Sequence, residues 1–159
     1  MTLLDKEPVR RVEKSLKEFN PNQNVIILDT SARTAEEAAS SLSCEVGAIV
    51  KSLLFKTENK FTLFLVAGDK KASLNKIKKI LDIKDASMAS ANDVKDITGY
   101  TIGGVSPVGH LNKIEIFIDN SLERFNSLFA AAGHPNCVFK ISFSNLQKIT
   151  NGKIMEIVE

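Results

Sequence analysis

The residues with the clearest chemical potential lie in one glycine-rich segment, 99–110, whose sequence is GYTIGGVSPVGH. It holds four of the chain's eight glycines, and glycine is concentrated where the backbone turns unusually or lies close to another group. Pro107 fixes its own φ and favours an extended Ser106. We expect a stiff loop with uncovered backbone N–H groups. Such a loop either binds an anion or a polarised carbonyl, or only connects two elements sharply.

The spacing of these glycines argues against the common nucleotide-binding loops. The segment lacks the Gly-Lys-Ser/Thr ending of a P-loop, and its glycines do not follow the dinucleotide-binding fingerprint. A nucleotide-binding or small-molecule-binding protein stays an alternative, which tight binding of an adenosine nucleotide would favour.

Lys51 is the second residue that could do chemistry. In an extended segment over 49–55 it shares a face with Ile49, Leu53 and Phe55, and the other face is apolar as well. Lysine is seldom placed in such a strand without a partner. Lys51 is therefore either a lysine whose stem lies along the apolar surface, or an ammonium aimed into a pocket to bind phosphate or polarise a carbonyl.

His134 is a third candidate, in the segment 131–136 (AAGHPN), which we interpret as a turn. A histidine between glycine and proline is either an exposed loop residue or a catalyst. His110, His134, Cys44 and Cys137 could be combined into a zinc site on paper, but their scattered spacing is not that of a zinc motif. We predict no metal and no cofactor.

Lysines cluster over the helix expected at 73–81 and its approaches. The cluster is either a solvated helix face or a patch that follows a phosphate backbone, and no interleaved aromatic residues indicate base stacking. Its members are Lys70, Lys71, Lys76, Lys78, Lys79 and Lys84, of which Lys70, Lys71, Lys76 and Lys79 are the candidates for contact with a nucleic-acid backbone.

The elements that must position these residues follow from hydrophobic spacing and turn residues. Thr34 is expected to cap a helix, with Glu37 completing a capping box, and Ser144 is a possible cap near the end of the chain. A hairpin turn is expected at 58–59, and 122–129 is ambiguous. Helices are expected over 8–19, 34–39, 73–81, 91–97 and 144–149, and strands over 25–28, 49–56, 61–67, 114–118 and 138–141.

Bulk properties indicate one mixed α/β domain over residues 1–159. A net charge of +2 does not by itself indicate a nucleic-acid partner, and two cysteines give no disulfide framework. The chain shows neither an apolar leader nor a membrane-spanning run, so we expect a cytoplasmic protein without a membrane partner.

Four segments together resemble the YbaK/ProX family, the aminoacyl-tRNA synthetase-associated domain that also occurs as the editing insertion (INS) domain of prolyl-tRNA synthetase. They are 48–55 (AIVKSLLF), 65–69 (LVAGD), 98–110 (TGYTIGGVSPVGH) and 131–136 (AAGHPN), in that order. The resemblance implies an α/β (α+β) fold in which a mixed, partly barrel-like β-sheet is flanked by helices. It also implies an activity, the hydrolysis of a wrong amino acid from tRNA.

The resemblance assigns roles to individual residues. Lys51 matches the functional lysine of the family, and Gly103-x-x-x-Pro107 matches its Gly-x-x-x-Pro loop. His134 matches a histidine of the branches related to alanine editing and to the insertion domain, but not of the branch that deacylates cysteinyl-tRNA(Pro). A thiol-assisted mechanism is therefore not expected.

The mechanism predicted from these residues needs no covalent intermediate. Lys51 would hold the terminal phosphate–ribose region, and backbone N–H groups at Gly103 and Gly104 would stabilise the oxyanion. Water would be oriented by His134 or by the neighbouring ribose hydroxyl, and the pocket beyond the loop would select the amino acid by size. Ser106, Pro107 and Asn136 are predicted to contact substrate.

The function predicted is that of a free-standing trans-editing aminoacyl-tRNA deacylase. Its partner would be the 3′ acceptor end of an aminoacyl-tRNA, and a synthetase such as prolyl-tRNA synthetase is a candidate second partner. The alternative is a non-catalytic tRNA-binding or synthetase-docking module of the same fold, which the lysine cluster would serve equally well.

Overall fold

The computed structural model describes residues 2–159 and contains five α-helices within that range. The first begins with a proline in its first turn, and its buried stripe is Val9, Val12 and Leu16, at the spacing of one helix face. The helices are α1 (Glu7–Phe19), α2 (Ala35–Leu42), α3 (Leu74–Leu81), α4 (Ala91–Thr98) and α5 (Phe143–Thr150).

Hydroxyl side chains cap the last four of these helices, because each accepts a backbone N–H that has no partner within the helix. The caps are Thr34, Ser73, Ser90 and Ser142. Thr34 is the expected cap, but the Thr34 hydroxyl donates to the Glu37 carboxylate at 3.2 Å, so this pair is not the reciprocal capping box. The cap expected at Ser144 is wrong, since Ser142 caps α5.

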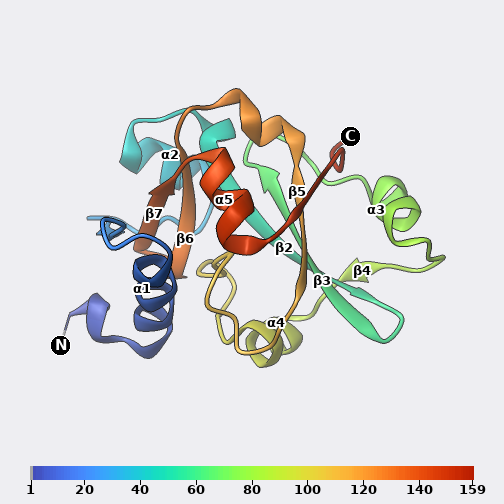
Figure 1. Cartoon of the computed structure of the whole chain (residues 1–159), viewed down its shortest axis with the longest axis horizontal. Coiled ribbons are helices and arrows are strands. Elements are labelled where there is room, and N and C mark those ends of the chain that lie inside the picture. The colour runs from blue at the N-terminus through green and yellow to red at the C-terminus, as the bar shows by residue number, and fades with distance from the viewer. Residues whose placement is uncertain (1) are drawn as a thin grey trace.

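Eight strands form one mixed sheet, which confirms the predicted fold class of a curled, partly barrel-like sheet flanked by helices (Figure 1). Its order is β1-β7-β6-β2-β3-β5-β8, with the short β4 paired to β2. The β2–β6, β3–β5 and β5–β8 pairs are parallel, and the others are antiparallel. The strands are β1 (Val25–Ile27), β2 (Ile49–Thr57), β3 (Lys60–Ala67), β4 (Ser87–Met88), β5 (Glu115–Asp119), β6 (Leu128–His134), β7 (Cys137–Ile141) and β8 (Lys153–Met155).

The ambiguous stretch 122–129 divides between two elements. A 3₁₀ turn covers Asn120–Arg124, and β6 begins at Leu128. The turn interpretation of 131–136 is wrong for its first four residues, because β6 continues through His134 with an irregular register between Ala131 and His134. Only Pro135 and Asn136 form the turn into β7.

Two hydrophobic clusters cover the two faces of the sheet. One packs α1, α4 and α5 against one face and includes the fully buried Leu16, Leu65 and Leu146. The other packs α3 and the C-terminal residues against the opposite face, around Phe64 and Ile77. Figure 1 shows α1 beside β6 and β7, and α3 at the far end of the molecule. No helix in the described range is long and apolar enough to cross a membrane.

The sheet divides at β2. Pairing of β2 with β6 covers only Ile49↔Phe129 and Val50↔Ala130, and pairing of β2 with β4 starts at Phe55↔Met88. Between these two contacts β2 is paired only to β3, on its other side. We call this stretch of β2, residues 51–54, the fork; at its end the Leu54 carbonyl accepts from Ala89 N–H at 2.9 Å.

Candidate active site

Ser52 lies in the middle of the fork, and its backbone N–H and C=O groups point into the gap between β2 and β6. Antiparallel pairing alternates the direction of N–H and C=O groups along a strand, and Gly68 N–H donates to Ile49 O at 2.8 Å. Odd-numbered residues of β2 therefore bond toward β3, and the backbone groups of Ser52 point to the side from which β6 has separated. The buried Ser52 hydroxyl has no hydrogen-bond partner among the described residues.

A cavity of about 450 Å³ opens at the fork. Lys51, Gly103 and His134, which come from three distant segments, all line it. Most of the remaining lining is aliphatic, so the cavity offers a few polar groups on an apolar wall, as small-molecule sites generally do. The apolar members include Ala32, Ala35, Val50, Leu54, Val94, Val105, Ala130 and Val138.

Lys51 is half-buried and its ammonium donates to the Lys70 carbonyl. Burial lowers the pKa of Lys51, Glu36 and Asp69 oppose that shift, and Lys71 adds to it. A partly desolvated ammonium interacts strongly with an approaching anion, because little water screens it. Lys51 can therefore hold a phosphate or the oxygen of a polarised ester.

Gly103 presents the tip of the glycine-rich loop to the cavity. Its φ of +96° is one that side-chain-bearing residues rarely adopt, although a methyl group there would meet only Pro135 and Arg33, at 3.5 and 3.8 Å. The Gly103 N–H has no hydrogen bond to another described residue. It is thus available as a donor.

Gly104 was predicted to donate its N–H to the oxyanion, but this N–H is already used within the loop. Its N–H donates to Thr101 O at 3.0 Å and its carbonyl accepts from Gly133 N–H at 3.0 Å. A Cβ on Gly104 would lie 2.9 Å from the Gly133 carbonyl carbon and 2.9 Å from the His134 nitrogen. The expected oxyanion donor at Gly104 is therefore already bonded, and this glycine allows the loop to lie against β6.

Ser106 and Pro107 lie behind the loop and not in the cavity lining. Both are buried, the Ser106 hydroxyl accepts from Val108 N–H at 3.4 Å, and the Ser106 carbonyl lies 2.6 Å from His110 Nε2. Pro107 lines a separate open groove against α1 and α5. This arrangement does not give either residue the predicted contact with substrate, because both pack on the side of the loop that faces away from the cavity.

His134 ends β6 at the cavity. Asn136 N–H donates to His134 Nδ1 at 3.0 Å, so in the neutral ring the proton resides on Nε2. Burial, together with Lys6 and Arg33, lowers the pKa of His134, which keeps the ring neutral at pH 7. The neutral ring then offers a hydrogen-bond donor at Nε2, not a free base.

Asn136 lies in the hairpin turn, outside the cavity lining. Its side-chain amide donates to Leu28 O at 3.4 Å, and its backbone carbonyl accepts from Leu28 N–H at 2.7 Å. Asn136 therefore joins the turn to the chain after β1 and orients His134, in place of the predicted substrate contact.

The lysine cluster begins beside the cavity and continues away from it. Lys70 supplies the carbonyl that Lys51 binds, and Lys71 is exposed next to it. Lys76 bonds Glu156 at 2.9 Å and Val158 O at 2.6 Å, so this side chain is partly engaged in holding the C-terminus. Lys79 is exposed on α3. None of the four lines the cavity.

Two charged residues of the cavity, Arg33 and Glu36, were missed as site residues. Both line the cavity at the start of α2. Their only signal in the sequence is membership of the 33–39 stretch, whose spacing indicates a helix start and no chemistry. The Cγ of Arg33 lies 3.8 Å from a Cβ built on Gly103, so the stem of this side chain passes beside the loop.

The cysteines are isolated from one another. Cys137 lines the cavity and burial raises the pKa of its thiol, which disfavours the reactive thiolate. Burial also raises the pKa of Cys44. Within residues 2–159 no three or more histidine, cysteine or acidic side chains form a group that could hold a metal ion.

The chain is similar to a known protein family and to several proteins of known sequence or structure. Residues 29–149 match the family model described as "Aminoacyl-tRNA editing domain". The chain is 32% identical to the uncharacterized protein YwhH of Bacillus subtilis over 147 residues, which covers 92% of this chain and 93% of YwhH.

Two further likenesses concern prolyl-tRNA synthetase. The chain is 31% identical over 153 residues to the proline–tRNA ligase of Caldicellulosiruptor bescii, and the match covers 91% of the chain but 25% of that enzyme. A crystal structure of a candidate trans-editing enzyme for prolyl-tRNA synthetase superposes with a TM-score of 0.91 at 34% identity, covering 97% of this chain and 98% of that one.

Proposed function

We propose, from the premise that this chain belongs to the aminoacyl-tRNA editing domain family, that it is a free-standing deacylase that hydrolyses the ester of a misacylated tRNA in the cytoplasm. Similarity over nearly the full length of a protein described as a candidate trans-editing enzyme supports action in trans. A synthetase, prolyl-tRNA synthetase first, is the proposed second partner.

The observation that carries this proposal is the convergence of Lys51, Gly103 and His134 on one cavity. Ester hydrolysis passes through a tetrahedral intermediate whose negative oxygen must be stabilised by donors fixed in advance. Here three residues that carry an ammonium, a free backbone N–H and an imidazole N–H line one cavity.

In the proposed reaction the aminoacyl ester lies with its carbonyl oxygen toward Gly103 N–H. Water adds to the carbonyl carbon, the charge on the oxygen is held by that N–H, and the bond from carbon to the ribose oxygen then breaks. The ribose hydroxyl leaves with one proton of the water, the amino acid leaves as its carboxylate, and the other proton of the water passes to the solvent. Lys51 binds the terminal phosphate–ribose region and so positions the ester.

His134 acts in this proposal as a donor from Nε2 to the substrate. Its Nδ1 is occupied by Asn136 N–H, which leaves no lone pair on the neutral ring to accept the proton of the water. The neighbouring ribose hydroxyl is therefore the group that orients the water.

The aminoacyl side chain would enter the apolar part of the cavity. Val50, Leu54 and Ala130 form part of its wall, so an apolar amino acid fits better than a charged one. Selection by size in such a pocket gives about 1–3 kcal/mol per methylene. The backbone groups of Ser52 face the same space and are available to bind the polar part of the aminoacyl group.

A deacylation screen against a panel of misacylated tRNAs tests the proposal. The wild-type chain should hydrolyse at least one of them, Lys51→Ala should not, and Lys56→Ala should match wild type because Lys56 is exposed on the same strand. Binding of tRNA without turnover by the wild-type chain would overturn the deacylase and leave the docking module.

A further inference from the structure

The glycine-rich loop is closed at its base by contacts that the catalytic proposal does not use. We call this base the neck: Gly99 and Tyr100 on the incoming side, Val108 and Gly109 on the outgoing side. Gly99 and Gly109 have φ values of +81° and +74°, so both ends of the loop adopt the left-handed backbone conformation that glycine favours.

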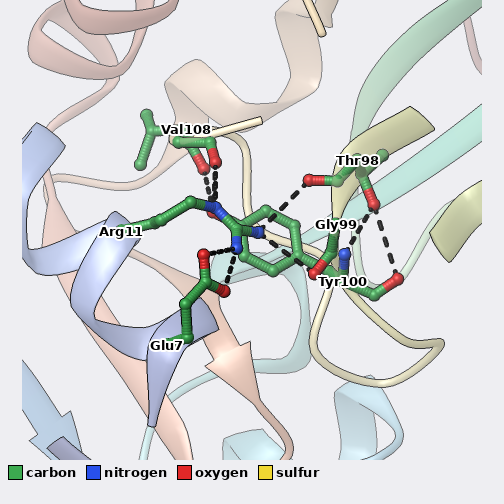
Figure 2. A network of polar contacts seen from close by, with 7 residues as sticks. Glu7, Arg11, Thr98, Gly99, Tyr100 and Val108 are labelled. Atoms are coloured by element: carbon green, nitrogen blue, oxygen red, sulfur yellow. Dashed lines mark hydrogen bonds and ion pairs between the residues drawn. The ribbon is translucent and has the colours of Figure 1, made fainter. Parts of the chain in front are cut away.

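Arg11 of α1 cross-links the two sides of the neck (Figure 2). Its Nε donates to Gly109 O at 2.9 Å, and one terminal nitrogen donates to Gly99 O at 3.0 Å. The same nitrogen lies 3.4 Å from Thr98 O. The planar guanidinium has its donors in a fixed fork, and here that fork spans carbonyls that lie ten residues apart in the chain.

Tyr100 forms the second link of the neck. Its ring lies under the Arg11 guanidinium, 4.7 Å from the ring centre, and its hydroxyl lies 2.7 Å from Val108 O and 2.9 Å from Gly109 O. Tyr100 is almost fully buried, and burial raises its pKa to about 12. The phenol therefore remains a hydrogen-bond donor throughout the ordinary pH range.

The start of α1 also sets the end of β6. A Cβ on Gly133 would lie 2.8 Å from the Pro8 carbonyl carbon and 3.0 Å from the Val9 nitrogen. Gly133 N–H in turn donates to Gly104 O. One helix thus contacts the neck through Arg11 and the strand that carries His134 through its first turn.

We propose that Arg11 is a positioning residue that fixes the neck, and through it the place of the Gly103 N–H at the cavity. The inference rests on the proposed function for its catalytic consequence. Arg11 itself is not in the cavity lining, and its ion pair with Glu7 cannot be its main contribution, because Glu7 is 67% exposed and exposed pairs contribute little.

The test compares Arg11→Met with Arg10→Met, which removes the same charge from an exposed position on the same helix. The first readout is amide hydrogen exchange in the ligand-free protein. Arg11→Met should speed exchange in residues 99–110 by about tenfold or more, with Arg10→Met unchanged, because the neck then opens locally.

The second readout is the kinetics of deacylation. Arg11→Met should lower kcat by about ten- to a hundredfold with KM within about twofold, since a small displacement of a positioned donor costs rate more than binding. Arg11→Lys keeps the charge and reaches one carbonyl only, so it should be intermediate in both readouts, and it keeps the test open if the methionine variant does not fold.

Unchanged exchange over 99–110 in Arg11→Met would overturn the neck as a constraint. Faster exchange with kcat equal to that of Arg10→Met would overturn its role in positioning Gly103. If the wild-type chain deacylates no tRNA, the proposed function fails, and the exchange measurement still decides whether Arg11 holds the loop.

Discussion

Asp119 at the end of β5 and Ser52 in the middle of β2 are polar residues of the same sheet, but they differ in what they bind. The fully buried Asp119 carboxylate accepts from Ser121 N–H at 2.9 Å and from the Ser121 hydroxyl on one oxygen. Its other oxygen accepts from Ile157 and Val158 N–H at 2.7 and 3.2 Å. The Ser52 hydroxyl is buried without a partner among the described residues.

The difference distinguishes a buried polar group that the fold itself satisfies from a buried polar group that the fold leaves without a partner. Folded proteins satisfy nearly all their buried polar groups, so an exception calls for a reason. Around Asp119 the chain satisfies its own groups and thereby fastens its C-terminal residues to the sheet. At the fork the Ser52 hydroxyl, like that of Ser31, has no partner among the described residues, and Ser52 lines the cavity.

The largest effect should come from Lys51, and it should fall on activity alone. We expect Lys51→Met to lower kcat/KM by about 100- to 1,000-fold, the loss typical of one removed charge-stabilising group. The free energy of unfolding should stay constant or rise, because burial lowers the pKa of Lys51 and so opposes its charge in the folded state. Deacylation rates and urea unfolding check both, and a large loss of stability would place Lys51 on the structural side of the comparison.

At Asp119 we expect the opposite result, a loss of stability without a loss of activity. Asp119→Ala leaves the Ile157 and Val158 N–H groups without their acceptor and should lower the free energy of unfolding by about 3 kcal/mol. Activity per folded molecule should stay near wild type, because Asp119 is not in the cavity lining. Denaturant unfolding measures the loss, and a selective loss of turnover in the folded variant would contradict the comparison.

A smaller effect should distinguish the two adjacent glycines of the loop. Gly103→Ala has room for its methyl group but a φ of +96°, and this strain of about 1–2 kcal/mol should move the donor and cost about tenfold in kcat/KM. Gly104→Ala would meet backbone atoms at 2.9 Å, so it should lower stability first. Parallel thermal melts and kinetics separate the pair, and equal profiles would contradict the different roles.

The smallest effect should come from His134→Gln. Glutamine keeps an N–H donor, so the loss in kcat/KM should stay below about tenfold, whereas removal of a general base typically costs about 10²–10⁴-fold.

The ring itself should titrate below the ordinary value of about 6.5, because its pKa is lowered in the fold. The neutral ring is then the favoured folded form. Its contribution to stability is present above the unfolded pKa and lost as pH falls toward the folded pKa. An NMR titration of both imidazoles checks this, and a pKa above 6.5 for His134 would contradict the Asn136–Nδ1 bond.

The helices and strands were largely predictable because their signals are local. The stripe of α1, the Thr34 cap and the β2–β3 hairpin all follow from spacing or turn residues within a few positions. The cap at Ser142 was displaced by two residues, and β4 and β8, of two and three residues, are too short to show a period.

The site was predictable only in part, because its geometry depends on contacts between distant segments. Lys51, the glycine-rich segment and His134 were candidates from residue type and pattern, and the family resemblance assigned their roles. No periodicity indicates that β6 leaves β2 after Val50. The occupied N–H of Gly104 and the reach of Arg11 to Gly109, 98 residues away, depend on packing that a single sequence does not display.

The central claim is that the fork receives the aminoacyl end of a tRNA. The most direct measurement is a titration with a non-hydrolysable aminoacyl-adenosine, in which an amide replaces the ester, followed by backbone NMR shifts of the protein. Saturable shifts at Ser52, Gly103 and Asn136 N–H, weakened in Lys51→Met, are the result we predict. Shifts confined to α3, or to the groove behind the loop at Pro107, would contradict the account.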